Sequence, residues 1–147
     1  MAAAAEGACV LIVDDNVELL ELMAASLPRL SSFTVVTCED GASALQRYYA
    51  LDPRPVCVVI DVVMPEMNGY QLVRALRGDA TSAQTPLIML TAMVQDRDRF
   101  IGLASGADQY LNKPVTPAEL VTAIQRALTI SETERQQRMQ QMIEEES

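Results

Sequence analysis

The stretch VCVVID, residues 56–61, decides the fold that the sequence predicts. Five apolar residues in a row, with no alternating polar ones, are typical of a strand covered on both faces, as in the middle of a parallel sheet. The carboxylate that follows, Asp61, is costly to bury without a cation or a hydrogen-bond donor beside it. The stretch therefore predicts a central strand that carries an acid to the end of the sheet.

Three other apolar runs end in polar side chains in the same way. Because the carboxyl ends of parallel strands meet at one edge of a sheet, we expect these side chains to converge with Asp61. Lys113 is the only lysine among the eleven basic residues, which indicates that the edge needs a compact point charge rather than a planar guanidinium. The run over residues 8–13 ends at Asp14 and Asp15, the run over 87–90 ends at Thr91, and residues 110–111 lead through Asn112 to Lys113.

The apolar runs alternate with segments whose apolar residues recur at helical spacing, which predicts βα units around a parallel sheet. The predicted fold class is therefore α/β, with a five-stranded parallel sheet and helices on both of its faces. The first and third strands are continuous apolar runs and are expected near the centre of the sheet. The expected strands span residues 9–13, 34–38, 56–60, 87–90 and 109–112, and the expected helices span 17–27, 40–49, 70–77, 96–104 and 117–128.

A chain of 147 residues is long enough for one domain with its own core. We expect a flexible N-terminus over residues 1–7 and a folded domain over residues 8–128. The remaining segment, residues 129–147, is rich in helix formers and has neither glycine nor proline, so it is expected to be a polar helical extension or connector.

Composition excludes several classes of function. The formal net charge of −9 argues against direct nucleic-acid binding by this chain, because such binding needs basic patches that neutralise phosphates. The absence of histidine removes the commonest general base. No apolar stretch approaches the roughly 20 residues that cross a bilayer, so we expect a cytoplasmic protein with no membrane contact. The three cysteines lie in or beside apolar runs and are expected to be buried and reduced.

Three carboxylates at one sheet edge repel one another unless a cation lies among them. Oxygen ligands without histidine or cysteine favour Mg²⁺, held by carboxylates, waters and a phosphoryl oxygen. A carboxylate can also accept a phosphoryl group as an acyl phosphate, and Asp61 is the best candidate because it ends a central strand. Lys113 would attract the incoming charge, and the hydroxyl of Thr91 would donate a hydrogen bond to a phosphoryl oxygen.

Five short motifs follow one another along the chain: VDDN (residues 13–16), DVVMPEMNG (61–69), LTA (90–92), GADQY (106–110) and KP (113–114). Each is weak alone. Together, in this order and spacing, they resemble the receiver domains of two-component response regulators, the CheY-like domains, from about residue 8 to residue 128. The resemblance implies a flavodoxin-like (βα)5 fold and a phosphorylation-controlled switch in signal transduction rather than an enzyme.

The same resemblance assigns the metal and phosphoryl ligands. It implies that Asp61 accepts a phosphoryl group from the phosphohistidine of a sensor histidine kinase or phosphotransfer protein. Asp15 would bind Mg²⁺ directly, and Asp14 would help through a water molecule. Asp61 and the backbone carbonyl of Val63 would complete the protein ligands of the metal, and Lys113 would contact the phosphoryl group.

The resemblance also assigns the switch. Thr91 and Tyr110 match the pair whose hydroxyl and ring reposition when the phosphoryl group is present. The bond between Lys113 and Pro114 is expected to be cis, as it is in the family. The rearrangement would change a protein-interaction surface for an output domain or a downstream protein, neither of which the sequence identifies.

Three positions depart from what is common in the family. Val63 and Met93 are apolar where the side chains flank the path of the hydrolytic water, so we expect slow self-dephosphorylation. Gln109 replaces an acid found in many receivers that dimerise through their last helices. That substitution argues against this dimer mode, although a homodimer through the helical extension stays open.

Two rival functions and one structural alternative remain. An aspartyl-phosphate hydrolase would need a second acid two residues after Asp61, where Val63 stands. A phosphorylation-independent, receiver-like protein-binding module would not need the intact acids, hydroxyl and lysine. Taken alone, Asp15 with Glu18 three residues later would indicate no more than a helix N-cap with a capping box.

Overall fold

The computed structural model describes residues 7–92, 106–129, 137, 140–141 and 143–144. The helix expected over residues 96–104 and the position Met93 lie outside the described residues. The described parts of residues 7–129 contain five strands and four helices. In chain order the elements are β1 (Cys9–Val13), α1 (Val17–Leu30), β2 (Thr34–Cys38), α2 (Gly41–Ala50), β3 (Cys57–Asp61), α3 (Gly69–Gly78), β4 (Leu87–Thr91), β5 (Gln109–Asn112) and α5 (Pro117–Ala127).

The five strands form one parallel sheet in the order β2-β1-β3-β4-β5. This order confirms the predicted five-stranded parallel sheet and the central places of the first and third strands. β3 is buried along its whole length, as its unbroken apolar sequence predicts. All five strands point the same way, so the loops that follow β1, β3, β4 and β5 leave from one edge of the sheet.

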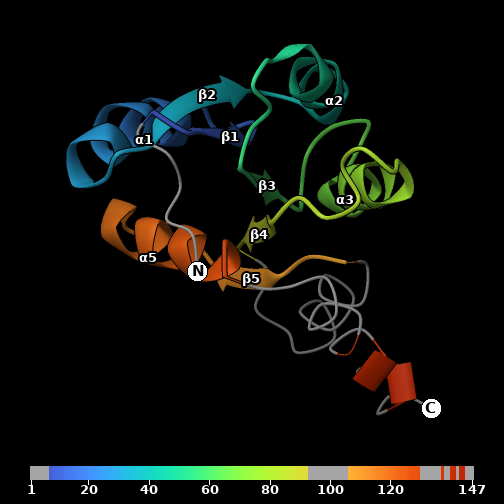
Figure 1. Ribbon diagram of the computed structural model, residues 1–147. Coiled ribbons are helices and arrows are strands. Elements are labelled where there is room, and N and C mark those ends of the chain that lie inside the picture. Colours follow the sequence, from blue (N-terminus) through green and yellow to red (C-terminus); the bar gives the residue numbers. More distant parts are fainter. Residues whose placement is uncertain (1–6, 93–105, 130–136, 138–139, 142, 145–147) are drawn as a thin grey trace.

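Helices cover both faces of the sheet, α1 and α5 on one and α2 and α3 on the other (Figure 1). Successive side chains of a strand point to opposite faces, so each central strand feeds two separate cores. In β1, Val10 and Ile12 pack with α1 and α5, whereas Leu11 and Val13 pack with α2 and α3. A strand that serves two cores has no polar face, which explains the continuous apolar runs.

β1, β2 and β5 have the predicted boundaries, and the other described elements differ from theirs by one to three residues. β3 begins and ends one residue later than expected, so Asp61 is its last residue rather than the first residue of the loop. α1 runs three residues past Leu27, through Pro28 to Leu30. Pro28 lacks the backbone N–H of an ordinary helical residue, but the turn continues over the buried side chain of Leu27.

The end of the sheet opposite the acidic edge is tied together by Arg77 in the last turn of α3. Its Nε donates to the carbonyl of Gly106 at 2.8 Å, and its Nη1 donates to the carbonyl of Thr85. Its Nη2 lies 3.2 Å from Oδ2 of Asp108. The same Asp108 oxygen accepts the backbone N–H of Leu87 at 2.8 Å. One guanidinium thus connects α3 with the starts of β4 and β5.

Two smaller expectations meet different outcomes. Cys57 is buried, as expected, but Cys9 and Cys38 are partly exposed. Beyond α5, the described residues 137, 140–141 and 143–144 are helical. Within the described part of the chain, no helix is long and apolar enough to cross a membrane.

We predict that Asp108→Ala lowers the free energy of unfolding by about 3–5 kcal/mol, because it leaves a largely buried guanidinium without its carboxylate. Asp108 is 1% exposed. Urea unfolding followed by circular dichroism measures the change. Glu21→Ala, an exposed substitution on α1, is the control and should shift stability by less than about 0.5 kcal/mol. Equal effects of the two substitutions would contradict the structural role of Asp108.

Candidate functional site

Three acids meet at the carboxyl edge of the sheet, as the sequence predicts. Asp14 and Asp15 directly follow β1, and Asp61 is the last residue of the neighbouring strand β3. Each offers a carboxylate oxygen, and the three oxygens lie within 4.8 Å of one another. Asp14 is completely buried and Asp61 is 5% exposed, while Asp15 is exposed. The cluster is therefore two buried acids with a third at the solvent boundary.

The carboxylate of Asp14 is held from two sides. Its Oδ1 accepts the backbone N–H of Asn16 at 2.8 Å. Its Oδ2 lies 2.7 Å from Nζ of Lys113. These two contacts fix the orientation of the Asp14 side chain within the site.

Lys113 is shared between the two buried acids. Besides Asp14, its Nζ approaches Oδ1 of Asp61 at 3.5 Å. The main chain of Lys113 is fixed by a hydrogen bond from its N–H to the carbonyl of Thr91 at 2.7 Å. The following bond to Pro114 is cis, as the resemblance implies. The only lysine of the chain therefore lies where the sequence predicts, among the acids.

Asp61 has a strongly shifted pKa. Burial raises the pKa of its carboxyl most, the negative charge of Asp14 raises it further, and the ammonium of Lys113 opposes both; the pKa is about 6. The raised pKa means that burial and the charge of Asp14 destabilise the carboxylate of Asp61 more than Lys113 stabilises it. A further cation close to Asp61 would therefore be bound favourably.

Asp15 does not cap the first helix, so that alternative is wrong. The N-cap of α1 is Asn16, whose side chain accepts the backbone N–H of Leu19 at 3.2 Å. Asn16 therefore serves twice, because its own backbone N–H also binds Asp14. The sequence analysis overlooked Asn16; its position before a helical pattern was the available signal.

The loop that follows Asp61, residues 62–68, turns sharply into α3. The N–H of Gly69 donates to the carbonyl of Val62 at 2.9 Å. A side chain at Gly69 would overlap the carbonyl oxygen of Asp61 and lie 2.9 Å from Cα of Val62. Glycine is therefore required here by close backbone approach. Val63, in contrast, is 60% exposed at the mouth of the site.

The two residues of the predicted switch lie on adjacent strands. Thr91 ends β4 and is fully buried. Tyr110 lies in β5 opposite Met89, is 4% exposed, and packs in the core on the face covered by α2 and α3. Taken alone, Tyr110 would be expected to be half-buried; the ring is in fact enclosed.

The donor set suits a hard divalent cation. Asp14, Asp15 and Asp61 offer only carboxylate oxygens, and the chain has no histidine. Mg²⁺ prefers such ligands and keeps several waters, which the exposed side of the cluster at Asp15 allows. The residues present therefore fit the expected Mg²⁺.

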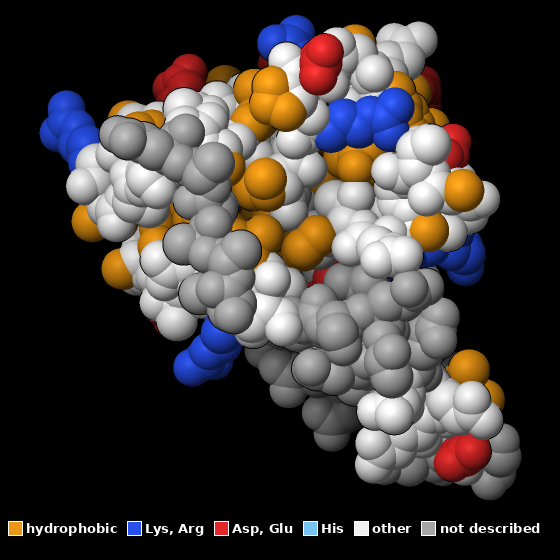
Figure 2. Space-filling model, viewed as in Figure 1, with side chains coloured by type: hydrophobic (Ala, Val, Ile, Leu, Met, Phe, Trp, Pro, Cys, Tyr) orange, Lys and Arg blue, Asp and Glu red, His pale blue; other side chains and the backbone are white. Residues whose placement is uncertain are grey.

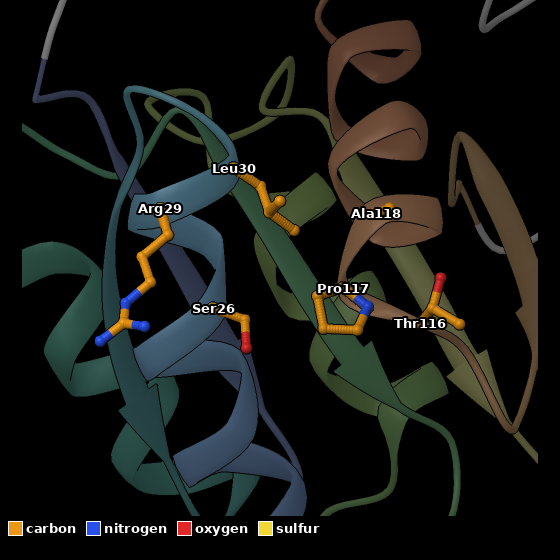
Figure 3. Close-up of a pocket in the computed structure, with 6 residues that line it drawn as sticks. All are labelled: Ser26, Arg29, Leu30, Thr116, Pro117 and Ala118. Atoms are coloured by element: carbon orange, nitrogen blue, oxygen red, sulfur yellow. The ribbon is translucent and has the colours of Figure 1, made fainter.

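On the face shown in Figure 2, the described lysine and arginine side chains are spread apart rather than gathered in a patch. A separate groove of about 320 Å³ lies between α1 and α5. Figure 3 shows Ser26 and Leu30 of α1 pointing across it toward Pro117 of α5. None of the acids lines this groove.

Comparison with known proteins identifies the arrangement. The sequence model of the response regulator receiver domain matches residues 10–125, most of the chain. The chain belongs to this family. Receiver domains are signalling domains of two-component systems and in general not enzymes.

Relatives and solved structures agree with the family. The receiver domain is 41% identical over 128 residues to the transcriptional regulatory protein CpxR of Escherichia coli K12, covering 87% of this chain and 52% of that protein. It spans about half the length of the curated relatives it matches. Its fold matches Vibrio cholerae CheY4 with a TM-score of 0.76 at 32% identity, over 82% and 98% of the two chains. The BeF3-activated receiver domain of Klebsiella pneumoniae RstA matches with a TM-score of 0.73 at 29% identity, over 83% and 99%.

We predict that removing the charge of Asp61 stabilises the metal-free receiver domain. The carboxyl has a pKa of 3.8 without the fold and of about 6 within it. The folded state therefore holds the proton more tightly, and the resulting stability is present below about pH 4 and lost as pH rises through about 6. In EDTA, Asp61→Asn should raise the free energy of unfolding by up to about 3 kcal/mol near pH 7.5.

Urea unfolding at the two pH values measures this effect, and near pH 4 the variant should gain little. Glu21→Gln, which removes an exposed charge on α1, is the matched control and should show no such pH dependence. An Asp61→Asn variant that is less stable than the native chain near pH 7.5 would contradict the electrostatic origin of the shift.

Proposed function

We propose that this chain is a phosphoacceptor receiver domain, in which Asp61 takes a phosphoryl group from the phosphohistidine of a sensor kinase or phosphotransfer protein. The observation that carries the proposal is the pairing of Asp61 and Asp14 with one ammonium, Lys113, at 3.5 and 2.7 Å. Two buried acids that share one lysine leave a net negative charge, so this arrangement can receive an anionic phosphoryl group when a divalent cation joins the lysine in neutralising it.

The transfer itself needs only one nucleophile. A carboxylate oxygen of Asp61 attacks phosphorus while the phosphorus–nitrogen bond of the donor breaks and the nitrogen keeps the electron pair. The product is an acyl phosphate on Asp61 and a neutral imidazole on the donor once a proton is taken up. Lys113 then pairs with a phosphoryl oxygen, and the hydroxyl of Thr91 donates a hydrogen bond to another.

Asp14, Asp15, Asp61 and the backbone carbonyl of Val63 would hold Mg²⁺, Asp14 through a water molecule. When bound, the metal neutralises the charge that gathers on the phosphoryl oxygens. The proposal is supported by the three carboxylate oxygens within 4.8 Å and by the raised pKa of Asp61. The RstA receiver domain, described as BeF3-activated, supports it further, because beryllium fluoride imitates a phosphoryl group.

Phosphorylation would act through Thr91 and Tyr110. A phosphoryl group can shift the equilibrium between two conformations only by interacting differently with them. Thr91 ends β4, and Tyr110 lies on the neighbouring strand β5. Through these two residues the difference would reach the surface made by the helix expected over residues 96–104, β5 and α5. This surface would then change its preference for a partner.

What the switch controls is inferred from the share of its relatives' length that the chain spans and from the composition of residues 129–147. Because the chain spans about half of relatives such as CpxR, named a transcriptional regulatory protein, we propose that the receiver domain controls an output domain or a downstream protein. Residues 129–147 would be the connector. The side chain of Gln109 donates to the carbonyl of Ala123 at 2.6 Å, so it is used within the chain, which argues against the dimer mode that needs an acid there. A cytoplasmic location stays a prediction.

We predict that the native chain gains one phosphoryl group when incubated with Mg²⁺ and either acetyl phosphate or phosphoramidate, whose phosphorus–nitrogen bond imitates phosphohistidine. Intact mass spectrometry measures the gain. Asp61→Asn should gain none, because the amide is a poor nucleophile, and EDTA should abolish labelling of the native chain.

Exposed Asp79→Asn is the matched control and should be labelled like the native chain. Absence of label in every condition would contradict the proposal and favour a phosphorylation-independent binding module. Rapid release of inorganic phosphate with continuous turnover of the donor would instead favour a hydrolase.

We predict that the acyl phosphate on the native chain outlasts that on Val63→Gln by several-fold. Val63 is apolar and 60% exposed at the mouth of the site, so it cannot orient a water molecule for attack, whereas an amide can. The decay of the label after removal of the donor measures both lifetimes. Loss of the native label within seconds would contradict slow self-dephosphorylation.

A further inference from the structure

The loop between β3 and α3, residues 62–68, must be fixed in place if Asp61 is to accept a phosphoryl group in one geometry. Its ends are held by the main chain: the N–H of Val62 donates to the carbonyl of Leu90 at 3.2 Å, and Gly69 donates back to Val62 at 2.9 Å. Between these ends Glu66 adopts a left-handed conformation with φ of 66°, which is unfavourable for a residue with a side chain. The middle of the loop therefore needs side-chain contacts to hold it.

One such contact reaches across to the first residue of α2. Met67 packs against the core on the α2 and α3 face, and its side chain lies directly over the buried Gly41. A methyl group built on Gly41 would lie 2.9 Å from Sδ, 3.0 Å from Cγ and 3.1 Å from Cβ of Met67. Carbon and sulfur atoms in van der Waals contact stay near 3.5–4 Å apart. Only glycine leaves the space that Met67 occupies.

The backbone of Gly41 does not itself require glycine. Among the described glycines only Gly7 and Gly106 have positive φ, so Gly41 has a conformation open to any residue. Gly41 is the first residue of α2, directly after the N-cap Asp40. The physical reason for glycine at this position is therefore the room that it gives to Met67.

We propose that Gly41 is a positioning residue for phosphoryl acceptance, because it seats Met67 and so fixes the loop that follows Asp61. This inference rests on the proposed function. Rotating the methionine side chain would relieve the contacts with Sδ and Cγ, but not the one with Cβ at 3.1 Å, which is fixed to the backbone. The loop main chain has to move by a few tenths of an ångström to relieve that contact. The same main chain carries Val63, whose backbone hydrogen bond lowers the pKa of Asp61, so the movement reaches the acceptor carboxylate.

The test is the rate at which acetyl phosphate labels Gly41→Ala in Mg²⁺, measured by intact mass. We expect it to fall about tenfold, since a displacement of about 1 Å at a reacting group can cost up to 10²-fold. In a Met67→Ala background, Gly41→Ala should slow labelling much less than it does in the native chain, because the contacts with Sδ and Cγ are gone and only the contact with Cβ at 3.1 Å remains. Gly78→Ala is the matched control: nothing lies within 4 Å of its added methyl group, so its rate should equal that of the native chain.

A purely structural role for Gly41 would lower stability without changing the rate in the folded protein. Rates are therefore measured on samples shown to be folded by urea titration. If Gly41→Ala does not fold, Met67→Ala alone serves, because it removes the contact without adding a group and should also slow labelling. Native rates in both Gly41→Ala and Met67→Ala, or an equal effect of Gly41→Ala in the native chain and in the Met67→Ala background, would overturn the inference.

A second measurement separates this inference from the proposed function. The backbone amide signals of residues 62–64 in nitrogen-15 NMR should shift in Gly41→Ala, and Gly41→Ala should shift them less in the Met67→Ala background, with Gly78→Ala unchanged. This result does not require phosphorylation. A native chain that takes no label overturns the proposed function, whereas unshifted loop amides in Gly41→Ala overturn the positioning role of Gly41.

Discussion

The acidic edge of the sheet depends on a single ammonium group. Two carboxylates up to 4.8 Å apart repel by about 3–4 kcal/mol in partly buried surroundings, and Asp14 and Asp61 have little water to weaken that repulsion. Lys113 lies between them at 2.7 and 3.5 Å and offsets much of it. Because its own main chain is bonded to Thr91, the lysine also ties the ends of β4 and β5 to those of β1 and β3.

The two ends of the parallel sheet are built for different purposes. At one end, charged side chains at the ends of the strands form a cluster in which Lys113 does not fully balance the negative charges, and the pKa of Asp61 is raised. At the other end Arg77 satisfies three carbonyl groups and the buried Asp108 at once, which leaves that end rigid. A receiver domain needs this asymmetry: one end binds and rearranges, while the other keeps the strands in register.

The sequence predicts most of the fold and the members of the acidic cluster, because both follow from local patterns. Unbroken apolar runs locate the central strands, and the strand direction alone brings Asp14, Asp61 and Lys113 to one edge. What it does not predict are contacts between distant elements. Arg77 resembles the other arginines in a helical pattern, and Asp108 has no visible partner until α3 and β5 are side by side. The contact of Met67 with Gly41 is hidden for the same reason. Asn16 was overlooked for a different reason, because the acid beside it, Asp15, fits the same N-cap pattern.

The lone lysine has a consequence for the chemical reactivity of the chain. Lys113 is the only lysine, so a reagent that modifies amines can react only with this side chain and with the N-terminal amine. An acyl phosphate donor such as acetyl phosphate has two electrophilic atoms, phosphorus and the acyl carbon. At this edge the carboxylate of Asp61 can react at phosphorus, while an amine would react at carbon. An ammonium bonded to two carboxylates has no free electron pair to offer. The ion pairs that order the site thus also direct such a donor toward phosphoryl transfer and away from acylation of the lysine on which the site depends.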